Sequence, residues 1–455
     1  MVTIGSLRSV RLDEEKCRGC THCIKRCPTE AIRVREGKAR INVERCIDCG
    51  ECIRICENHA KLAVSDPLAA IEAFRYRVAL AAPSIFAQFR GEQSPGRILG
   101  ALAALGFQEV VEVAEGAEYT TAAIRNLLAR YDGPRPLISS ACPAVVRLIQ
   151  VRFPGLLDQV IPVEAPVDVA AKIYRRRQRE LGRSLDGVGL FFITPCPAKI
   201  TAYRERAAAG LGTLDGCLSM ADLYGPLKKL LSQPDLPELP MAAGGLGLGW
   251  ARAGGENLAL GERNLLAVDG IHNVSAVLEE IELGKLADVD YLEANACVGG
   301  CVGGPLTVEN PFVARVKIRR LSENLGTRTL GERVVAEAAR LGAEGFFAPP
   351  AGLAPLPSLA LDRDVGTAIT KVNRIEETLR TLPGLDCGAC GCPTCRVLAE
   401  DIVQGEAVLT DCVIKLREQL ALLAGDLLSL AQKLPPAMGQ AQAGKEEGKS
   451  TDDAE

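Results

Sequence analysis

The sequence has no apolar run of 18 residues, no excess of charge of one sign and no signal-like start. Without such a run it cannot form a membrane-spanning helix of ordinary length, and its first residues lack the apolar core of a secretory signal. The net charge of −4 disfavours nucleic-acid binding by attraction to phosphates. We therefore expect a cytoplasmic protein with no membrane insertion and no nucleic-acid partner.

The composition predicts folded domains that bind metal. Of the 455 residues, 47% are hydrophobic and 24% charged, which is enough for two to four domains with apolar cores. The chain has 18 cysteines, and without a secretion signal they indicate metal binding rather than disulfides. Eight lie before residue 60, five lie in the last 70 residues and five are spread between these groups.

The N-terminal cysteines form two runs with the same C-x2-C-x2-C-x3-C spacing. This spacing resembles that of two-cluster bacterial ferredoxins, in which the fourth cysteine of each run binds the other cluster. The resemblance implies one 4Fe-4S cluster on Cys17, Cys20, Cys23 and Cys56. It implies a second on Cys46, Cys49, Cys52 and Cys27. Zinc is the alternative, although zinc sites favour paired C-x2-C ligands.

The sequence predicts four regions, the first of which contains these two runs. Residues 8–64 form the α+β ferredoxin module, and residues 77–345 alternate strands and helices as a largely parallel α/β sheet does. Residues 370–434 form a small helical domain after a Pro-rich linker, and residues 435–455 form a disordered tail. Within the α/β region we expect a helix from Ser94–Pro95 to Gly106, a strand over 109–113 and a helix over 120–131.

Four cysteines of the α/β region follow predicted strands. Cys142 lies in SSACP, Cys196 in ITPCPAK, and Cys297 and Cys301 in EANACVGGCVGG. Because ligands of open α/β sheets bind beyond the carboxyl ends of strands, these loops would bring four thiols around one cubane. A lone buried cysteine is more often a small hydrophobic residue, and we expect this of Cys217.

These three motifs resemble the signatures TSCCP, MPCxxKxxE and ExMACxxGCxxGGG of the [FeFe]-hydrogenase catalytic domain, over roughly residues 77–325. The resemblance implies that domain's fold, with two βαβ lobes. It implies that the four cysteines bind the cubane of the H-cluster and that Cys301 bridges to a di-iron subsite carrying CO and cyanide. Lys199 would donate a hydrogen bond to a cyanide; a solvated lysine is the alternative.

Departures from the family pattern concern proton transfer. Ala141 stands at the position of the proton-shuttle cysteine, and Ala202 at that of the second-motif glutamate. Ala123 and Ile124 replace the glutamates of a third segment. Because proton transfer needs titratable groups within hydrogen-bond reach, the expected relay is missing. The pattern resembles the sensory [FeFe]-hydrogenases, which implies slow turnover, H2 sensing or regulation, and a redox partner or a separate signalling output protein.

Two other functions are kept as alternatives. One is an electron-relay or iron–sulfur scaffold protein without the di-iron subsite, as in hydrogenase-like assembly factors that share this fold. The other is an efficient ferredoxin-linked hydrogenase, against which the missing relay argues. The glycine-rich segment 244–255 lacks a clean G-x-G-x-x-G after a strand and so does not predict dinucleotide binding.

The C-terminal cysteines have the spacing C-x2-C-x4-C-x16-C, as Cys387, Cys390, Cys395 and Cys412. They resemble the small 4Fe-4S domain found in a component of Rnf complexes and in corrinoid iron–sulfur proteins, with a helix between the third and fourth ligands. Zinc is the alternative, and Cys392 is expected to be a free thiol. The prediction is four cubane sites: two N-terminal, one H-cluster-like and one C-terminal.

Overall fold

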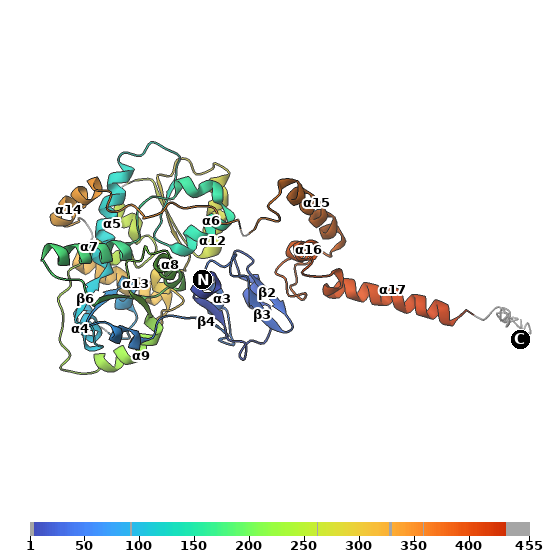
Figure 1. The fold of residues 1–455 in the computed structure, drawn as a ribbon, viewed down its shortest axis with the longest axis horizontal. Helices are drawn as coiled ribbons and strands as arrows, with labels where there is room; N and C mark the ends of the chain where they lie inside the picture. Colours follow the sequence, from blue (N-terminus) through green and yellow to red (C-terminus); the bar gives the residue numbers. More distant parts are fainter. Residues whose placement is uncertain (1–3, 92, 262, 327–329, 358, 434–455) are drawn as a thin grey trace, which may run out of the picture. The chain divides into compact units, whose positions relative to one another are not determined.

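The computed structural model describes residues 4–91, 93–261, 263–326, 330–357 and 359–433 (Figure 1). The chain divides into two compact units, Met1–Ala360 and Leu361–Glu455. The tail expected over 435–455 lies outside the described residues. Within the described residues, every helix is too short or too polar to span a bilayer.

The N-terminal module is α+β, as predicted. Strand β1 (Val10–Leu12) pairs with β4 (Lys61–Ala63), and β2 (Ile32–Arg35) pairs with β3 (Lys38–Ile41), both antiparallel. The short helices are α1 (Ile4–Leu7), α2 (His22–Lys25) and α3 (Glu51–Arg54). The two halves repeat the same detail: Ala31 N–H donates to Cys27 Sγ and Ala60 N–H to Cys56 Sγ, each at 3.2 Å.

The α/β region contains two parallel sheets. The first has the order β6-β5-β8-β9, with β5 (Tyr76–Ala81), β6 (Glu109–Glu112), β8 (Val188–Thr194) and β9 (Gly216–Ser219). The second has the order β10-β11-β7, with β7 (Leu137–Ile138), β10 (Leu265–Asp269) and β11 (Tyr291–Asn295). This confirms the α/β class with two lobes.

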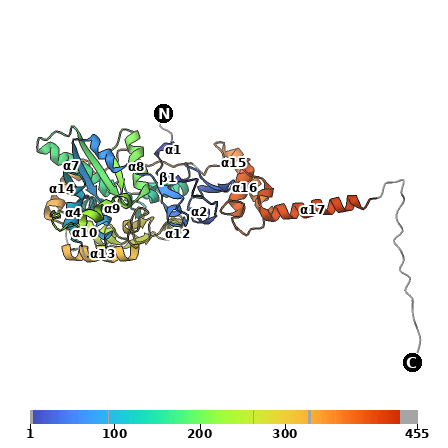
Figure 2. The same cartoon turned by 90° about the horizontal axis from the view of Figure 1, so that it is seen from below.

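Helices cover both faces of the first sheet. Helices α7 and α8 lie on one side of it and α4 and α9 on the other (Figures 1 and 2). The helices of the region are α4 (Pro95–Ala104), α5 (Val113–Leu128), α6 (Pro143–Arg152), α7 (Pro166–Glu180), α8 (Pro197–Ala208), α9 (Met220–Leu231), α10 (Gly245–Gly249), α11 (Gly255–Leu260), α12 (Ile271–Glu282), α13 (Pro311–Leu325) and α14 (Glu332–Ala343). Short 3₁₀ segments occur at Leu68–Ala73, Pro83–Ala87, Pro154–Gln159 and Cys301–Gly303. Because both faces are covered, the central strands β5 and β8 are almost wholly buried.

Local sequence signals predict the start of helix α4 correctly but not the start of helix α5. Helix α4 begins as predicted, because the Ser94 side chain accepts a hydrogen bond from the backbone N–H of Arg97. Helix α5 begins at Val113, directly after β6, so the start expected at residue 120 is wrong. Gly116 lowers helix propensity here, but a Cβ on it would lie 2.3 Å from the Pro166 carbonyl oxygen. Tertiary packing against α7 therefore requires the glycine and overrides its weak propensity.

The glycine-rich segment 244–255 serves packing between helices. A Cβ on Gly245 would lie 2.1 Å from the Ser322 carbonyl oxygen, and one on Gly247 would lie 2.1 Å from that of Ala114. Close backbone contact with α13 and α5 thus accounts for these glycines, in line with the sequence argument against a dinucleotide site.

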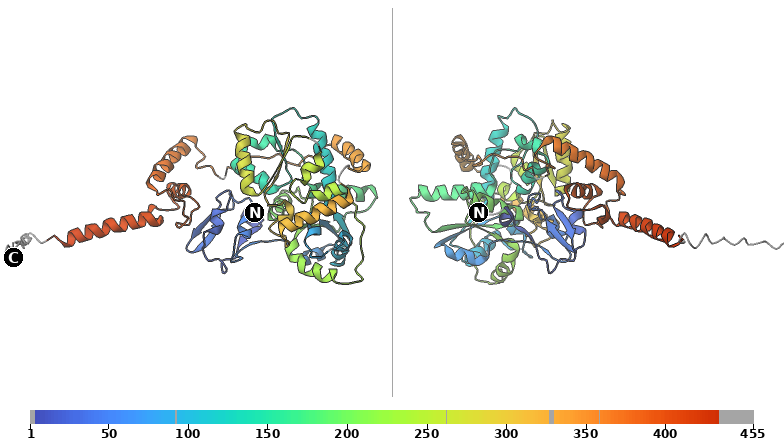
Figure 3. Two further views of the ribbon diagram at one scale, coloured as in Figure 1. Left: turned by 180° about the vertical axis from the view of Figure 1, so that it is seen from behind. Right: turned by 45° about the vertical axis from the view of Figure 1, so that its right-hand side comes forward.

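The second unit is helical, as predicted, and is drawn in orange to red in Figure 3. It contains α15 (Val365–Thr381), α16 (Cys395–Gln404), a 3₁₀ turn at Leu409–Asp411 and α17 (Val413–Ala431). Its core gathers Ile375, Leu382 and Leu398 with buried cysteines. No described residue of α17 is buried, so its leucine side chains contribute nothing to this core.

Candidate metal centre

Three loops from two different sheets supply the thiols of the central site. Cys142 follows β7, and Cys297 and Cys301 follow β11, its parallel neighbour. Cys196 follows β8 in the other sheet. All four cysteines line one cavity of about 70 Å³. The carboxyl ends of the strands thus bring together the residues that the sequence motifs singled out.

The thiols in this cavity are buried near one another. Burial and, to a smaller extent, the neighbouring thiols of Cys297 and Cys142 raise the pKa of Cys301 to about 12, against the opposing charge of Lys199. The pKa values of Cys196 and Cys297 are also raised, first by burial and then by neighbouring cysteines. Four thiolates cannot share such a site without cations. The donor set therefore fits an iron–sulfur cubane, which binds deprotonated thiols.

Lys199 joins two of the motifs at this cavity. Its Nζ donates a 3.1 Å hydrogen bond to the carbonyl oxygen of Ala141, and both residues line the cavity. Burial lowers the pKa of Lys199, but the thiolates of Cys301, Cys196 and Cys142 outweigh that effect and raise it. The side chain therefore stays a cation that can donate to an anionic ligand, and the solvated-lysine alternative does not match its position.

A buried carboxyl group in the same cavity was missed by sequence reasoning. Both carboxyl oxygens of Glu256 accept from Ser139 Oγ at 3.0 Å, and the Tyr291 hydroxyl also donates to Glu256. Glu256 is 5% exposed and lies on α11, distant in sequence from both partners. The signal that could have found it is the acidic residue that directly follows the glycine-rich segment.

A second buried glutamate holds the loops around this carboxyl group. Glu293 accepts from the backbone N–H of Gly254 at 2.8 Å and of Asn257 at 2.9 Å. The Asn295 side-chain amide donates to it at 3.0 Å. Burial raises the pKa values of both Glu256 and Glu293, and the charge of Glu293 raises that of Glu256 further. The pair favours holding a proton near the cavity.

The glycines of the third motif allow loops to pack against each other. A Cβ on Gly300, which has φ +88°, would lie 2.5 Å from the backbone nitrogen of Ala253. One on Gly304 would lie 2.3 Å from the carbonyl oxygen of Pro195, beside Cys196. Side chains here would push the cysteine loops apart.

A larger cavity of about 350 Å³ lies beyond the second motif. Ala202, at the position of the family's glutamate, lines this cavity and also a small one beside Lys199. Arg206 and Asp168, which form an ion pair of 2.6 Å, line both as well. The small side chain of Ala202 thus lies between the outer cavity and the lysine of the central site.

Five of the eight N-terminal cysteines belong to one apolar cluster of the module: Cys17, Cys23, Cys27, Cys52 and Cys56. Cys49 packs instead against the cluster that contains Cys196. The ammonium of Lys61 is buried in the module and has no hydrogen-bond partner among the described residues. Its charge acts on the thiols of Cys23 and Cys52, although burial is the larger effect and raises the pKa of Cys52 to about 12. A buried cation without a partner fits a site for anionic clusters.

Three of the four predicted C-terminal ligands lie in one core cluster, and the fourth is exposed. Cys395 and Cys412 are buried and Cys390 packs against them, whereas Cys387 is exposed. Cys392 is buried and its thiol donates to Asp401 at 3.3 Å, and Cys217 is buried in β9. Within the described residues no three Cys, His, Asp or Glu side chains converge tightly enough to hold a single metal ion.

The sheets and cysteine sites define an iron–sulfur protein of several clusters. Residues 75–243 and 250–305 match the family described as "Iron only hydrogenase large subunit, C-terminal domain". Residues 9–57 match a 4Fe-4S dicluster domain, and residues 382–414 match an Fe-S cluster family. The chain is an [FeFe]-hydrogenase-like iron–sulfur protein with an N-terminal ferredoxin module, as the sequence motifs predicted.

Several curated proteins and solved structures are similar to the chain. The periplasmic [Fe] hydrogenase large subunit of Nitratidesulfovibrio vulgaris is 28% identical over 49% of this chain and 58% of its own length. Iron hydrogenase 1 of Clostridium pasteurianum is 24% identical over 47% and 46%. The match thus spans about half the length of these relatives. A component of an ion-translocating oxidoreductase complex from Rhodobacter capsulatus is 50% identical over 38 residues, 8% of this chain and 20% of its own. A variant of the [FeFe]-hydrogenase HydA1 from Chlamydomonas reinhardtii has a TM-score of 0.47, with 17% identity over 64% of this chain and 98% of that one.

Proposed function

We propose that this chain is a low-turnover [FeFe]-hydrogenase-like protein that senses dihydrogen or regulates in response to it. The observation that carries the proposal is the cavity lined by Cys142, Cys196, Cys297, Cys301 and Lys199. The match over residues 75–305 to the hydrogenase large-subunit family supports the same chemistry. The alanine at position 141 of the same cavity supports the low turnover.

The proposal assigns sixteen cysteines to four cubanes. The central four hold the H-cluster cubane, and the two N-terminal sets and the C-terminal set hold one 4Fe-4S cluster each. Cys301 would also hold a di-iron subsite, which would supply, when bound, the reversible conversion of dihydrogen into two protons and two electrons. Lys199 is placed to donate to an anionic ligand of that subsite, since its cationic end already lies on the cavity wall.

Protons have to reach the cavity by groups other than those of the family's relay. Methyl groups stand at Ala141, Ala202 and Ala123, and they cannot carry protons. The carboxyl group of Glu256 lines the cavity and holds two hydrogen-bond partners, Ser139 and Tyr291. We assign the proton-holding role to Glu256, because it is the buried acid with a direct hydrogen-bond chain into the first motif: the Ala141 N–H donates to Ser139 Oγ at 3.3 Å.

Infrared spectroscopy tests the di-iron subsite. The full chain is matured with the hydrogenase maturases, and bands of bound CO and cyanide are measured together with iron content. We expect both bands at full iron loading. Full cubane loading without the bands would overturn the hydrogenase proposal and leave an electron-relay or scaffold protein. Exposure to dihydrogen followed by spectra of the clusters then measures the sensory response.

Electron partners and location are part of the proposal. A redox partner or a separate signalling protein would receive the electrons that the cubanes carry. We propose the cytoplasm as the location, although one similar protein is named as periplasmic. Cell fractionation in the native host tests the location, and co-purification from the same cells tests the partner.

A further inference from the structure

An arginine of the ferredoxin module extends into the third motif of the central site. Arg54 ends helix α3, between the cluster ligands Cys52 and Cys56. Its Nη2 donates a 2.6 Å hydrogen bond to the carbonyl oxygen of Gly303, two residues after Cys301. Its positive charge lies close enough to the thiol of Cys297 to lower the pKa of that thiol against the larger effect of burial, and it also acts on Cys49. One side chain thus contacts ligand loops of two proposed clusters.

The backbone at Gly50, near Arg54, also packs closely against loops of the central site. Gly50 has φ +75°, and a Cβ on it would lie 2.3 Å from Pro305 Cγ and 3.1 Å from Pro197 Cγ. Pro197 follows Cys196, and Pro305 lies in the loop after Cys301. The loop that carries Cys49 is therefore pressed between two cysteine loops of the central cavity. This close approach leaves no room for the module to shift without moving those loops.

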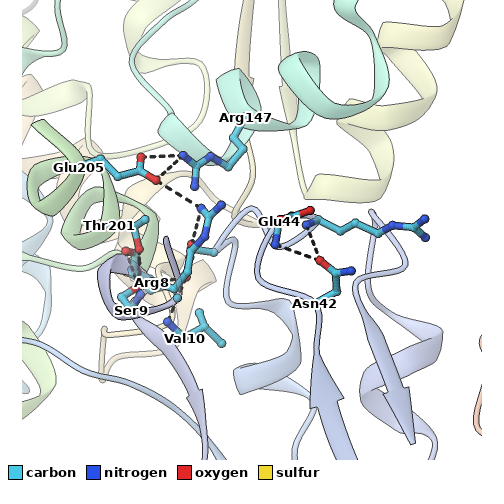
Figure 4. Close-up of polar contacts among 12 residues, drawn as sticks. Arg8, Ser9, Val10, Asn42, Glu44, Arg147, Thr201 and Glu205 are labelled. Carbon is cyan, nitrogen blue, oxygen red and sulfur yellow. Dashed lines mark hydrogen bonds and ion pairs between the residues drawn. The ribbon is translucent and has the colours of Figure 1, made fainter. Parts of the chain in front are cut away.

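A polar network also joins the N-terminal segment of the module to α8 at this junction (Figure 4). Asp48 accepts from the backbone N–H of Val10 at 3.0 Å and from Arg8 at 3.3 Å. Ser9 Oγ donates to the carbonyl oxygen of Pro197 at 2.7 Å, and its backbone N–H donates to Thr201 Oγ1 at 3.0 Å. Both acceptors lie on α8, directly after Cys196. The junction therefore holds Arg54 in a defined position.

We infer that Arg54 is a positioning residue that raises the reduction potential of the central cubane and couples it to the ferredoxin cluster on Cys27, Cys46, Cys49 and Cys52. The inference rests on the proposed cubane at the central cysteines. A cubane gains one negative charge when it takes up an electron. A cation held in place beside a ligand sulfur, here by its hydrogen bond to Gly303, stabilises that reduced state, which raises the potential. Arginine suits this role because it stays charged and its planar guanidinium can donate to two acceptors at once, here Glu51 and the Gly303 carbonyl oxygen.

The chain offers a matched control for the lost charge. Arg26 also pairs with Glu51, at 3.1 Å, but its side chain is 53% exposed and solvent screens its charge. Arg54 pairs with the same Glu51 at 3.2 Å and is 29% exposed. Replacing either arginine by leucine removes one positive charge and one partner of Glu51. Only the Arg54→Leu change removes the hydrogen bond to Gly303 and the positive charge beside Cys297.

The experiment is a potentiometric titration of the reconstituted full chain followed by electron paramagnetic resonance. The signal of the central cubane is identified as the one that the Cys196→Ala variant lacks. We expect Arg54→Leu to shift this signal to more negative potential and Arg26→Leu to leave it in place. Arg54→Lys keeps the charge but loses the planar guanidinium, so a smaller negative shift is expected. Iron content of each variant shows whether the clusters are assembled.

The possible outcomes separate a failure of the role inferred for Arg54 from a failure of the proposed central cubane. An Arg54→Leu protein with full iron and an unshifted cubane signal overturns the role of Arg54 and leaves the cubane intact. An equal shift in Arg26→Leu would mean that the overall charge of the module, and not the position of Arg54 beside the central site, sets the potential, which also overturns the inference. A wild-type chain with no signal assignable to the central cysteines would instead overturn the proposed site. If Arg54→Leu loses iron, the titration of Arg54→Lys decides, and an unchanged potential there overturns the role of Arg54.

Discussion

The ammonium of Lys199 donates a hydrogen bond to the carbonyl oxygen of Ala141, 58 residues earlier in the chain. This contact joins the second and first motifs at the position where a proton-shuttle cysteine would stand. The backbone of residue 141 thus contacts the lysine of the second motif, while its side chain is a methyl group without a thiol. A thiol can be placed there without changing the backbone contact.

Placing a thiol at position 141 tests the proposed cause of slow turnover. We expect Ala141→Cys in matured protein to raise hydrogen evolution by about tenfold or more, because general acid–base groups typically contribute 10²–10⁴-fold. The measurement is hydrogen production with a chemical reductant at equal infrared intensity of the CO bands. Ala141→Ser, of similar size but with a weaker acid, serves as the control. An unchanged rate for Ala141→Cys would show that protons enter elsewhere.

Removing one central thiol tests the ligand set. We expect Cys196→Ala to lose about four irons per chain, because a cubane needs its four thiolates. Cys217→Ala is the matched control, since Cys217 is also buried but lies in β9 within the hydrophobic core. The measurement is iron and sulfide content after anaerobic reconstitution. Equal iron in both variants would contradict the assignment of Cys196.

Removing the acidity of Glu256 tests its proton-holding role. Glu256→Gln keeps the shape and an acceptor for Ser139 but cannot exchange a proton, so we expect turnover to fall by about tenfold to a hundredfold. Glu118→Gln is the control: Glu118 is also buried and accepts from a backbone N–H, that of Gly244, at 2.9 Å, but does not line the cavity. The assay is hydrogen turnover at equal cluster content. A similar loss in both variants would indicate a packing effect.

Alanine substitutions at two glycines of the ferredoxin module distinguish the cost of backbone strain from the cost of close packing at the junction. Gly50 and Gly37 have φ values of +75° and +71°, but a Cβ on Gly37 would meet nothing within 4 Å. Gly37→Ala should cost about 1 kcal/mol from backbone strain. Gly50→Ala should cost about 2–4 kcal/mol, because overpacking against Pro305 is added. Urea denaturation of the reconstituted chain measures both. Equal destabilisation by the two substitutions would mean that Pro305 and its loop move aside at no cost in free energy.

The sequence predicted the parts of the fold that depend on local pattern. Apolar β-rich runs such as Val188–Thr194 end at the motif cysteines, so the strands and the carboxyl-end site follow from spacing and strand pattern. Ser94 with Pro95 marked a helix start because capping is local chemistry. The start of α5 was wrong because Gly116 is required by packing against Pro166, which no local pattern reveals.

Long-range contacts account for what the sequence could not predict. Glu256 meets Ser139 from 117 residues away and Tyr291 from 35, and these partners share no spacing rule. Arg54 meets Gly303 across 249 residues. In both cases an ordinary polar residue acquires its role only when two sheets and the N-terminal module bring their loops together.

Ser9 bonds the N-terminal segment to the carbonyl oxygen of Pro197 and to Thr201, while its neighbour Val10 holds Asp48 beside the cluster loop. Since small metal-bound modules fold only with their metal, this arrangement makes the order of assembly matter. In a chain that folds while starved of iron, we expect this first strand to lose its anchor and the loop of Cys196 to lose these contacts. The supply of iron to the N-terminal module would then decide whether the neighbouring central cavity is ready to receive its own cofactor.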